Sequence, residues 1–427
     1  MHPMERRNAL TRRHFLARSG GAALGVSSLG AFLAACSNST TPSQSTGTSG
    51  ELLGPGGYPL ARPDKPPVKL KYWEDPIPSG MKPETGGTFN IFNYPNYLDP
   101  AAMKAFGKKY GVTVQLTSFQ DISSGIARLA GGGVHPDVME MTPDNLERSV
   151  VAKLIKPLNH DYIPNLKNCW PSLQSPFYDE GSRYTVPYTT YATGILWRND
   201  HVTEEIASMK QPWDIFWQSH AYSGRVALLT EPRETIAMAL LRRGITDINT
   251  EDPKLINRAV ADLKQLNSIC NIKLDDTQFQ DVPEGKTWLH QAWSGDMLAG
   301  LLYYVPKGTK PSVLSYWKAP KGHVPVQNDC WSICATTKKP VLAHLWLNYI
   351  NDNGVAKSNF LNFNGYQPPL SELDPDSLIS SGTFPEFVKP AILTTEDFGP
   401  GSLQEMTLTN AGQALWQNGY ASFTAGG

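Results

Sequence analysis

The sequence predicts an α/β fold with a largely parallel sheet, and the order of its apolar segments is the main reason. The chain has 427 residues, of which 40% are hydrophobic and 18% charged, so it can bury a large core. Between residues 88 and 141 the pattern runs strand, helix, strand, helix, strand, which indicates a parallel sheet flanked by helices. The length favours two globular lobes. Ligands of such sheets lie beyond the carboxyl ends of the strands.

The first lobe is expected to begin with a strand over residues 88–93. Asp99 then caps a helix that Gly111 ends, because a capping carboxylate followed by proline is typical of a helix start and glycine of a helix end. The remaining elements of this stretch are a strand over 112–117, a helix over 122–129 and a short strand near Val138.

A buried strand over 186–197 is expected to cross into the second lobe. Segments 300–306 and 312–317 are expected to bring the chain back to the first lobe. The other elements predicted beyond the crossing are a strand over 226–230, a helix over 234–243, a helix capped by Asp252, a strand over 326–336 and a helix over 340–350.

The N-terminus carries an export pattern. Residues 11–16, Thr-Arg-Arg-His-Phe-Leu, form a twin-arginine motif ahead of an apolar stretch, 20–35, that is too short and too rich in glycine to span a bilayer. This stretch ends in Leu-Ala-Ala-Cys, which resembles the lipobox of bacterial lipoproteins, where the cysteine is acylated. We therefore expect a signal over 1–35, lipidation at Cys36 and a location outside the cytoplasm, anchored to the cell membrane.

Two segments of low complexity follow the expected lipidation site. Residues 36–50 are mostly Ser, Thr, Gly, Pro, Gln and Asn, which predicts a flexible tether. Residues 51–86 contain eight prolines, which predicts an extended arm on the surface rather than a helix or strand.

The net charge of the chain indicates which class of ligand it binds. The whole chain has 38 basic and 39 acidic residues, but the first 35 residues hold five arginines and one glutamate, so the remainder has 33 against 38, a net charge of −5. An acidic protein is a poor nucleic-acid binder, because that affinity comes from clustered Lys and Arg. A neutral or cationic small molecule suits it better.

Four cysteines remain beyond Cys36, namely Cys169, Cys270, Cys330 and Cys334. On one strand Cys330 and Cys334 would lie ~13 Å apart, too far for a disulfide between them. The spacing of all four does not match a metal site either, so we expect core thiols and no bound metal.

Catalytic motifs are absent from the sequence. It contains no H-E-x-x-H, no G-x-S-x-G and no G-x-G-x-x-G after a strand, and so predicts neither catalysis nor a cofactor. The carboxylates Glu231 and Glu234 leave one alternative open, an exported α/β hydrolase that uses them as acid or base.

Aromatic and acidic residues collect at the predicted strand ends. Aromatic faces attract cations, and a carboxylate in a dry cleft anchors an ammonium group by a charge-assisted hydrogen bond, so this composition favours a small organic cation as ligand. The residues concerned are Tyr94, Tyr97, Tyr188, Tyr191, Glu231, Glu234, Trp293, Asp329 and Trp331.

Six short motifs occur in an order known from one family. They are Asn-Tyr-Pro-Asn-Tyr at 93–97, Val-Pro-Tyr at 186–188, Leu-Leu-Thr-Glu-Pro-Arg-Glu at 228–234, Trp-Ser-Gly at 293–295, Asp329, and Gly-Tyr-Gln-Pro at 365–368. From residue 87 to about 364 the chain thus resembles extracytoplasmic solute-binding proteins of the spermidine/putrescine-binding type, the receptor components of ABC importers.

The resemblance implies a two-lobed periplasmic-binding-protein-like fold of type II, with 87–196 and 315–427 in lobe 1, 197–314 in lobe 2, and hinge strands near 195–198 and 312–317. It also implies a monomer that binds a polyamine or a related amine in the cleft and docks on a membrane permease. Its ligand site would comprise Tyr94, Asn96, Tyr97, Tyr188, Glu231, Glu234, Trp293, Asp329 and Trp331. Tyr94, Tyr97 and Trp293 would lie against the alkyl chain, and Glu234 and Asp329 would bind the amines.

The sequence departs from the family in three places. Asn96 stands where polyamine binders often have an acid, Met-Thr-Pro at 141–143 replaces Ser-Thr-Tyr, and Gln327 replaces a tryptophan. Trp331 lies two residues after Asp329, on the same face of the strand, and is expected to compensate for the lost tryptophan. Other amines, amino-acid derivatives and a ferric ion therefore stay open as ligands.

Overall fold

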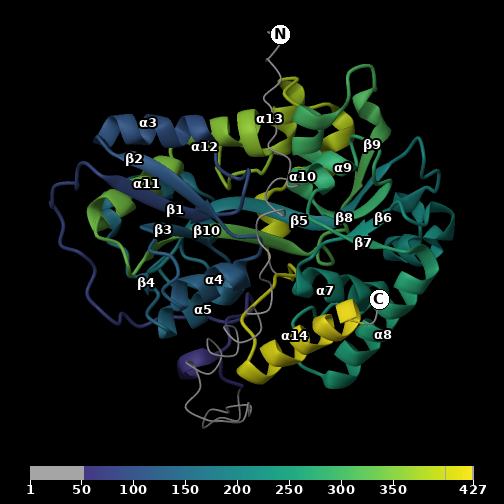
Figure 1. The fold of residues 1–427 in the computed structure, drawn as a ribbon, viewed down its shortest axis with the longest axis horizontal. Coiled ribbons are helices and arrows are strands. Elements are labelled where there is room, and N and C mark those ends of the chain that lie inside the picture. The colour runs from purple at the N-terminus through teal and green to yellow at the C-terminus, as the bar shows by residue number, and fades with distance from the viewer. Residues whose placement is uncertain (1–51, 400, 426–427) are drawn as a thin grey trace.

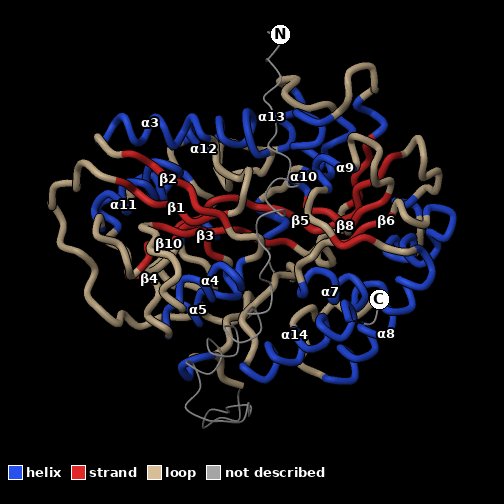
Figure 2. Tube along the Cα trace, viewed as in Figure 1, coloured by secondary structure: helices blue, strands red, loops and turns tan. Residues whose placement is uncertain are grey.

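A mixed β-sheet with helices on both faces forms the centre of the molecule in the computed structural model, which describes residues 52–399 and 401–425 (Figures 1 and 2). The expected export signal and tether lie outside these residues. The strands of the described part are β1 Thr88–Asn93, β2 Thr113–Ser118, β3 Val138–Met141, β4 Ile155–Lys156, β5 Val186–Arg198, β6 Val226–Leu228, β7 Lys273–Leu274, β8 Leu289–Trp293, β9 Leu314–Trp317 and β10 Val326–Cys334.

Strand β5 joins the two halves of the sheet. The strand order is β2-β1-β3-β10-β5-β8-β6-β7, with β4 paired to β10 and β9 paired to β5. Residues 186–192 of β5 pair with β10, and residues 193–198 pair with β8 and β9. The outer pairs β1/β2, β1/β3, β6/β7 and β6/β8 are parallel, as predicted. The centre is antiparallel, which the alternation of strands and helices does not reveal.

Helices cover the sheet on both sides, with α3, α12 and α13 above it and α4, α5, α7, α8 and α14 below it in the view of Figure 1. The α-helices of the described part are α3 Pro100–Tyr110, α4 Ile122–Ala130, α5 Pro143–Val151, α6 Pro171–Gln174, α7 Pro232–Arg242, α8 Pro253–Cys270, α9 Gln278–Asp281, α10 Ser294–Ala299, α11 Pro340–Ile350, α12 Asn353–Asn359, α13 Pro375–Ser380 and α14 Asn410–Ala425.

Local sequence chemistry fixes the ends of several helices. The Asp99 side chain accepts a hydrogen bond from the backbone of Ala101 at the start of α3, and Gly111 ends that helix in the left-handed conformation with φ 68°. Asp252 caps α8 in the same way. Segment 300–306 is different, because Gly300–Tyr304 continues α10 as a turn of π-helix rather than crossing back to the first half.

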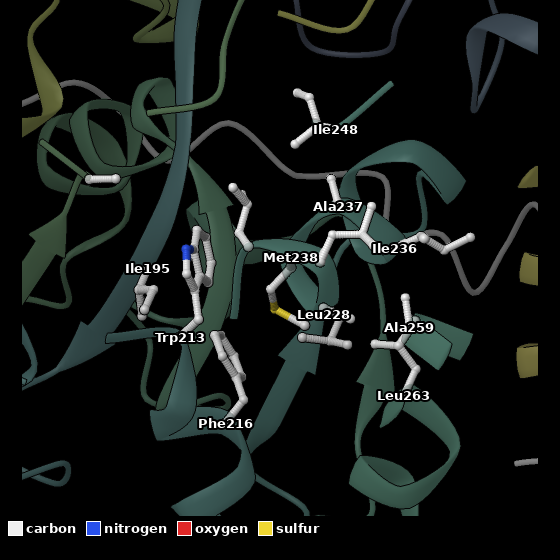
Figure 3. Packing of buried hydrophobic residues seen from close by; sticks show 14 of the residues in the cluster. Ile195, Trp213, Phe216, Leu228, Ile236, Ala237, Met238, Ile248, Ala259 and Leu263 are labelled. Atoms are coloured by element: carbon white, nitrogen blue, oxygen red, sulfur yellow. The ribbon is translucent and has the colours of Figure 1, made fainter. Parts of the chain in front are cut away.

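Each half of the sheet has its own apolar core. In the second half Trp213 and Phe216 of a 3-10 helix, Leu228 of β6 and Ile236 of α7 pack together (Figure 3). In the first half Phe89, Phe106 and Trp346 form a tilted and edge-to-face aromatic cluster between β1, α3 and α11.

The C-terminal helix packs mainly against helices of the second half, and its first residue, Asn410, also accepts a hydrogen bond from Arg148 of α5 in the first half. Helix α14 contacts α7 and α8, and Trp416 is fully buried among them with its indole N–H donating to the carbonyl of Thr250 at 2.9 Å. Figure 1 shows this yellow helix beside the teal α7 and α8. In the expected division this helix belongs to lobe 1 with the rest of 315–427; in the structure most of its contacts are with α7 and α8.

The two expected hinge segments lie side by side. Residues 195–198 of β5 pair antiparallel with Leu314–Trp317, so both belong to the second half of the sheet. The chain itself passes between the halves at the middle of β5 and again in the loop between β9 and β10.

The proline-rich segment lies along the first half without forming a strand of the main sheet. Leu70 is fully buried, and the Trp73 indole N–H donates to the carbonyl of Ile155 at 2.8 Å. The four cysteines of the described part are free and buried, which confirms the prediction of core thiols. Among the described helices none is long and apolar enough to cross a membrane.

Candidate functional site

A cavity of about 240 Å³ lies between the two halves of the sheet. Its walls come from the segments that directly follow β1, β2, β3, β6, β7 and β8, together with side chains of β5 and β10, the segment 363–366 and the start of α14. This position at the carboxyl ends of parallel strands is the one that the fold class predicts. The volume suits a small organic molecule rather than a peptide.

The lining is strongly acidic. Among the described residues it contains seven carboxylates and a single basic side chain, Arg233. The Arg233 guanidinium is engaged elsewhere, because it donates to the Asn249 side chain at 2.6 Å and lies over the Trp416 ring at 4.6 Å. The carboxylates are Asp144, Glu231, Glu234, Asp276, Asp296, Asp329 and Glu405. Such a cavity attracts cations and repels anions.

Asp329 presents a carboxylate from the first half. It lies in β10, is 4% exposed, and its Oδ2 accepts a hydrogen bond from the Tyr97 hydroxyl at 2.5 Å and a longer one from Thr189 at 3.3 Å. Burial raises the pKa of Asp329 to about 6, although these donors favour the anion. Two hydroxyl groups thus orient the Asp329 side chain and stabilise its anion.

Glu234 presents the matching carboxylate from the second half. It sits in the first turn of α7, is 6% exposed, and its Oε1 accepts from the Trp293 indole at 2.9 Å and from the Thr193 hydroxyl at 2.8 Å. Burial raises the pKa of Glu234, and the two hydrogen bonds and the charge of Arg233 oppose that rise. The partial positive charge at the start of a helix also favours an anion there.

A second group of acids lies beside Glu234. Glu231 precedes α7 without capping it, and burial together with the charges of Asp121 and Asp276 raises its pKa well above the usual range. Burial and the charge of Glu234 do the same for the pKa of Glu405. Because these carboxylates destabilise one another as anions, a bound cation would relieve that repulsion.

Aromatic rings form a continuous wall from one half of the cavity to the other. Ring centroids are 6.1 Å apart for Tyr94 and Tyr97, 5.0 Å for Tyr97 and Tyr366, 6.1 Å for Tyr366 and Tyr191, and 5.8 Å for Tyr191 and Trp293. All four contacts are edge-to-face. A wall of this kind packs against an alkyl chain and offers ring faces to a cation.

Gly295 explains one of the motifs found in the sequence. A Cβ at this position would lie 2.5 Å from the ring of Tyr366, so only glycine lets that ring join the wall. The Trp-Ser-Gly motif thus supplies the ring of Trp293 and, at Gly295, the space that the ring of Tyr366 occupies.

The structure brings seven of the nine expected site residues into the cavity lining. These are Tyr94, Asn96, Tyr97, Glu231, Glu234, Trp293 and Asp329. Asn96 is exposed and adopts a left-handed conformation with φ 59°.

Tyr188 and Trp331 lie behind the cavity wall. The Tyr188 hydroxyl donates to the carbonyl of Tyr97 at 2.5 Å, so Tyr188 supports the wall from behind. Trp331 is 0% exposed and packs between Tyr188 and Trp346 at centroid distances of 5.0 and 5.9 Å. The expectation that Trp331 compensates for the tryptophan replaced by Gln327 is wrong, because Trp331 lies one pleat too far from the cavity.

Several lining residues carried no sequence signal. Glu405, Gln413 and Gln417 come from the C-terminal segment, which has no motif and reaches the cavity only because α14 packs on α7 and α8. Asp276 was noticed only as half of an acidic pair; in the structure it accepts hydrogen bonds from the backbone and hydroxyl of Thr230. No group of three or more residues suited to a metal ion occurs in the described part of the chain.

Two relatives are similar to this chain in sequence. The chain is 26% identical over 266 residues to spermidine/putrescine-binding periplasmic protein 1 of Haemophilus influenzae, which covers 62% of this chain and 70% of that protein. It is 24% identical over 219 residues to the spermidine/putrescine-binding periplasmic protein of Escherichia coli, 51% of this chain and 61% of that one.

Solved structures agree on the fold. The spermidine/putrescine ABC transporter substrate-binding protein of Streptococcus pneumoniae superposes with a TM-score of 0.61 at 20% identity, over 80% of this chain and 99% of that one. A putative spermidine/putrescine ABC transporter protein of Listeria monocytogenes gives 0.66 at 18% identity, over 79% and 98%. The fold is therefore that of the type II periplasmic binding proteins, as predicted.

The family itself follows from a match over most of the chain. The profile described as bacterial extracellular solute-binding protein matches residues 101–385, a stretch that includes both halves of the sheet and the carboxylates Glu234 and Asp329. This family consists of solute-binding proteins and not of enzymes, so the hydrolase alternative falls away. The chain belongs to the bacterial extracellular solute-binding protein family.

Proposed function

We propose that this protein is the receptor of an ABC importer and binds a polyamine, such as spermidine or putrescine, or a related amine in the cavity between its halves. The observation that carries the proposal is the lining, which sets seven carboxylates against one already engaged guanidinium. The names of the relatives from H. influenzae and E. coli point to the same class of solute. The acidic charge of the chain beyond residue 35 agrees with a cationic ligand.

The arrangement of acids and rings fits a cation with charged ends and an apolar middle. Asp329 lies in the first half and Glu234 in the second, and the aromatic wall runs between them. An alkyl diamine would place one ammonium group on each carboxylate and its methylene groups on the rings. Such a ligand bridges the halves, and would favour a closed form by its greater affinity for that form.

We assign the two lobes to the two halves of the sheet, with β5 as the shared strand about which they bend. The closed, loaded protein would then dock on a membrane permease as a monomer and release the solute chemically unaltered. No cofactor takes part in this cycle.

The test is binding without turnover. In a thermal-shift screen against putrescine, spermidine and cadaverine, a ligand at 100 times its Kd should stabilise the full chain by ~2.7 kcal/mol. Calorimetry should give one ligand per chain, recovered unchanged. D329A and E234A should each abolish most of the shift while the unliganded protein stays folded. Failure of every amine to bind, or unaltered binding in both variants, would overturn the proposal.

We further propose that the chain leaves the cytoplasm through the twin-arginine pathway and is anchored by lipid at Cys36. The support is the order of Arg12 and Arg13, a short apolar stretch and Leu-Ala-Ala-Cys. Labelling with a radioactive fatty acid in cells should mark the wild type and not C36S. Replacement of both arginines by lysine should retain the protein in the cytoplasm. Labelled C36S, or normal export of the double-lysine variant, would contradict this.

A further inference from the structure

A second carboxyl group lies behind Asp329. Glu140 of β3 is 0% exposed and sits opposite Trp331 in the antiparallel ladder between β3 and β10. Asp329 precedes Trp331 by two residues on β10, so Glu140 and Asp329 are diagonal neighbours across the two strands, and each carboxyl group shifts the pKa of the other. Glu140 does not line the cavity, and no motif in the sequence includes it.

The hydrogen-bond donors around the two acids indicate which of them carries a proton. Neither oxygen of Glu140 accepts a hydrogen bond from any described N–H or O–H donor. A buried carboxylate without donors is strongly disfavoured, so Glu140 must be neutral. Asp329, in contrast, accepts from the hydroxyl groups of Tyr97 and Thr189, which stabilise its anion.

Two acids in contact form a hydrogen bond only when one of them is protonated. We propose that Glu140 is a positioning residue of the binding site: in its protonated form it donates a hydrogen bond to Asp329 and holds that carboxylate, as an anion, toward the cavity. The pair then carries one negative charge and one proton. This inference concerns the same cavity and rests on the proposed function for its ligand.

The surroundings of Glu140 keep the proton in place. The ionisable groups that act on it or respond to it come from five elements and are all acids, namely Asp329 and Cys330 of β10, Tyr94 after β1, Tyr188 of β5, Asp144 of α5 and Glu231 before α7. Burial and these neighbours raise the pKa of Glu140 well above its usual range. Its charge therefore does not add to that of Asp329 at neutral pH.

Two substitutions distinguish whether Glu140 acts as a hydrogen-bond donor, as a charge or only by the volume that it fills. Glutamine keeps the length of Glu140 and can donate an N–H to Asp329, so E140Q imitates the neutral acid. Methionine keeps much of the volume but cannot donate. We expect E140Q to bind putrescine within about twofold of wild type at every pH, since it neither adds nor removes charge.

E140M should lose about tenfold or more in putrescine affinity at neutral pH, because Asp329 loses a donor to its anion. The pH at which binding is half lost should also move upward. A purely structural role would lower stability without moving this pH profile. If E140Q loses as much affinity as D329N, Glu140 acts as a charge and the inference is wrong; an unshifted profile in E140M also overturns it.

Infrared spectroscopy of the unliganded full chain gives an answer that depends on neither ligand nor E140M. The wild type at neutral pH should show a carboxylic-acid C=O stretch that E140Q lacks, while D137N, which changes a buried acid outside the cavity, should retain it. Identical spectra for wild type and E140Q would overturn the inference. If no amine binds the wild type, the proposed function fails, yet this measurement still decides where the proton sits.

Discussion

Replacing Asp329 by asparagine is the most specific perturbation of the site, because it removes a charge and almost no volume. A carboxylate offers about four acceptor positions, and two hydroxyl groups, those of Tyr97 and Thr189, already bind Oδ2. We count one charge-assisted hydrogen bond to the ligand ammonium as lost, which is worth about 1.5 to 3 kcal/mol. Since 1.4 kcal/mol is tenfold in Kd, D329N should weaken putrescine binding by about 10- to 150-fold.

Isothermal titration of putrescine into D329N at neutral pH measures this directly. The matched control is D137N, the same change at a buried aspartate of the same half, which accepts from the Asn90 backbone and the Thr337 hydroxyl and does not line the cavity. The control should bind like wild type. Equal affinities of D329N and wild type, or an equal loss in D137N, would show that the Asp329 carboxylate does not bind the ammonium group.

Three further predictions follow from the same geometry. The pKa of Asp329 is raised to about 6, so amine affinity should persist above that pH and fall as the pH drops through it. The stability of the unliganded protein should change in the opposite direction and increase as the pH drops through about 6, because the folded chain binds this proton more tightly than the unfolded chain does. Calorimetry and thermal melts between pH ~5 and ~8 check both signs, and parallel trends would contradict them. W293F should weaken putrescine binding by about tenfold, because the indole no longer donates to Glu234. The control W288F, outside the cavity, should bind like wild type. Equal affinities of the two variants would count against a role of the Trp293 indole in binding. G295A should displace the Tyr366 ring and reduce both putrescine affinity and stability. The control G133A, where a Cβ meets nothing closer than 3.5 Å, should change neither binding nor melting temperature. A G295A variant with unchanged affinity and stability would disprove the close approach of Gly295 and Tyr366.

The sequence contained enough to predict the elements whose ends are fixed locally. The strand over 88–93 is confirmed as β1, and the helix that Asp99 begins and Gly111 ends is confirmed as α3. The helix over 340–350 is confirmed as α11. These limits depend on side-chain caps, proline and glycine, which act within a few residues.

Features set by distant packing could not be predicted in this way. The antiparallel centre of the sheet depends on how β5 and β10 meet, and the place of α14 depends on the apolar faces of α7 and α8. Glu405 reaches the cavity for the same reason.

The candidate site shows the same division. Acids and rings that directly follow strands, such as Tyr94 and Glu231, were found because the ends of parallel strands meet at one edge. The position of Trp331 was predicted wrongly because the two-residue period of a strand shows which face a side chain is on and not how far along the strand it lies. Glu140 was missed because a carboxylate with no donor is visible only once its neighbours are known.

Comparison of a diamine with its uncharged analogue of equal length shows whether the acids and rings between the two halves bind an organic cation. Titration of the full chain with putrescine and with 1,4-butanediol isolates the contribution of the charge. We expect one putrescine to bind per chain and no detectable binding of the diol. Equal binding of the two, or binding of neither by a folded protein, would contradict it.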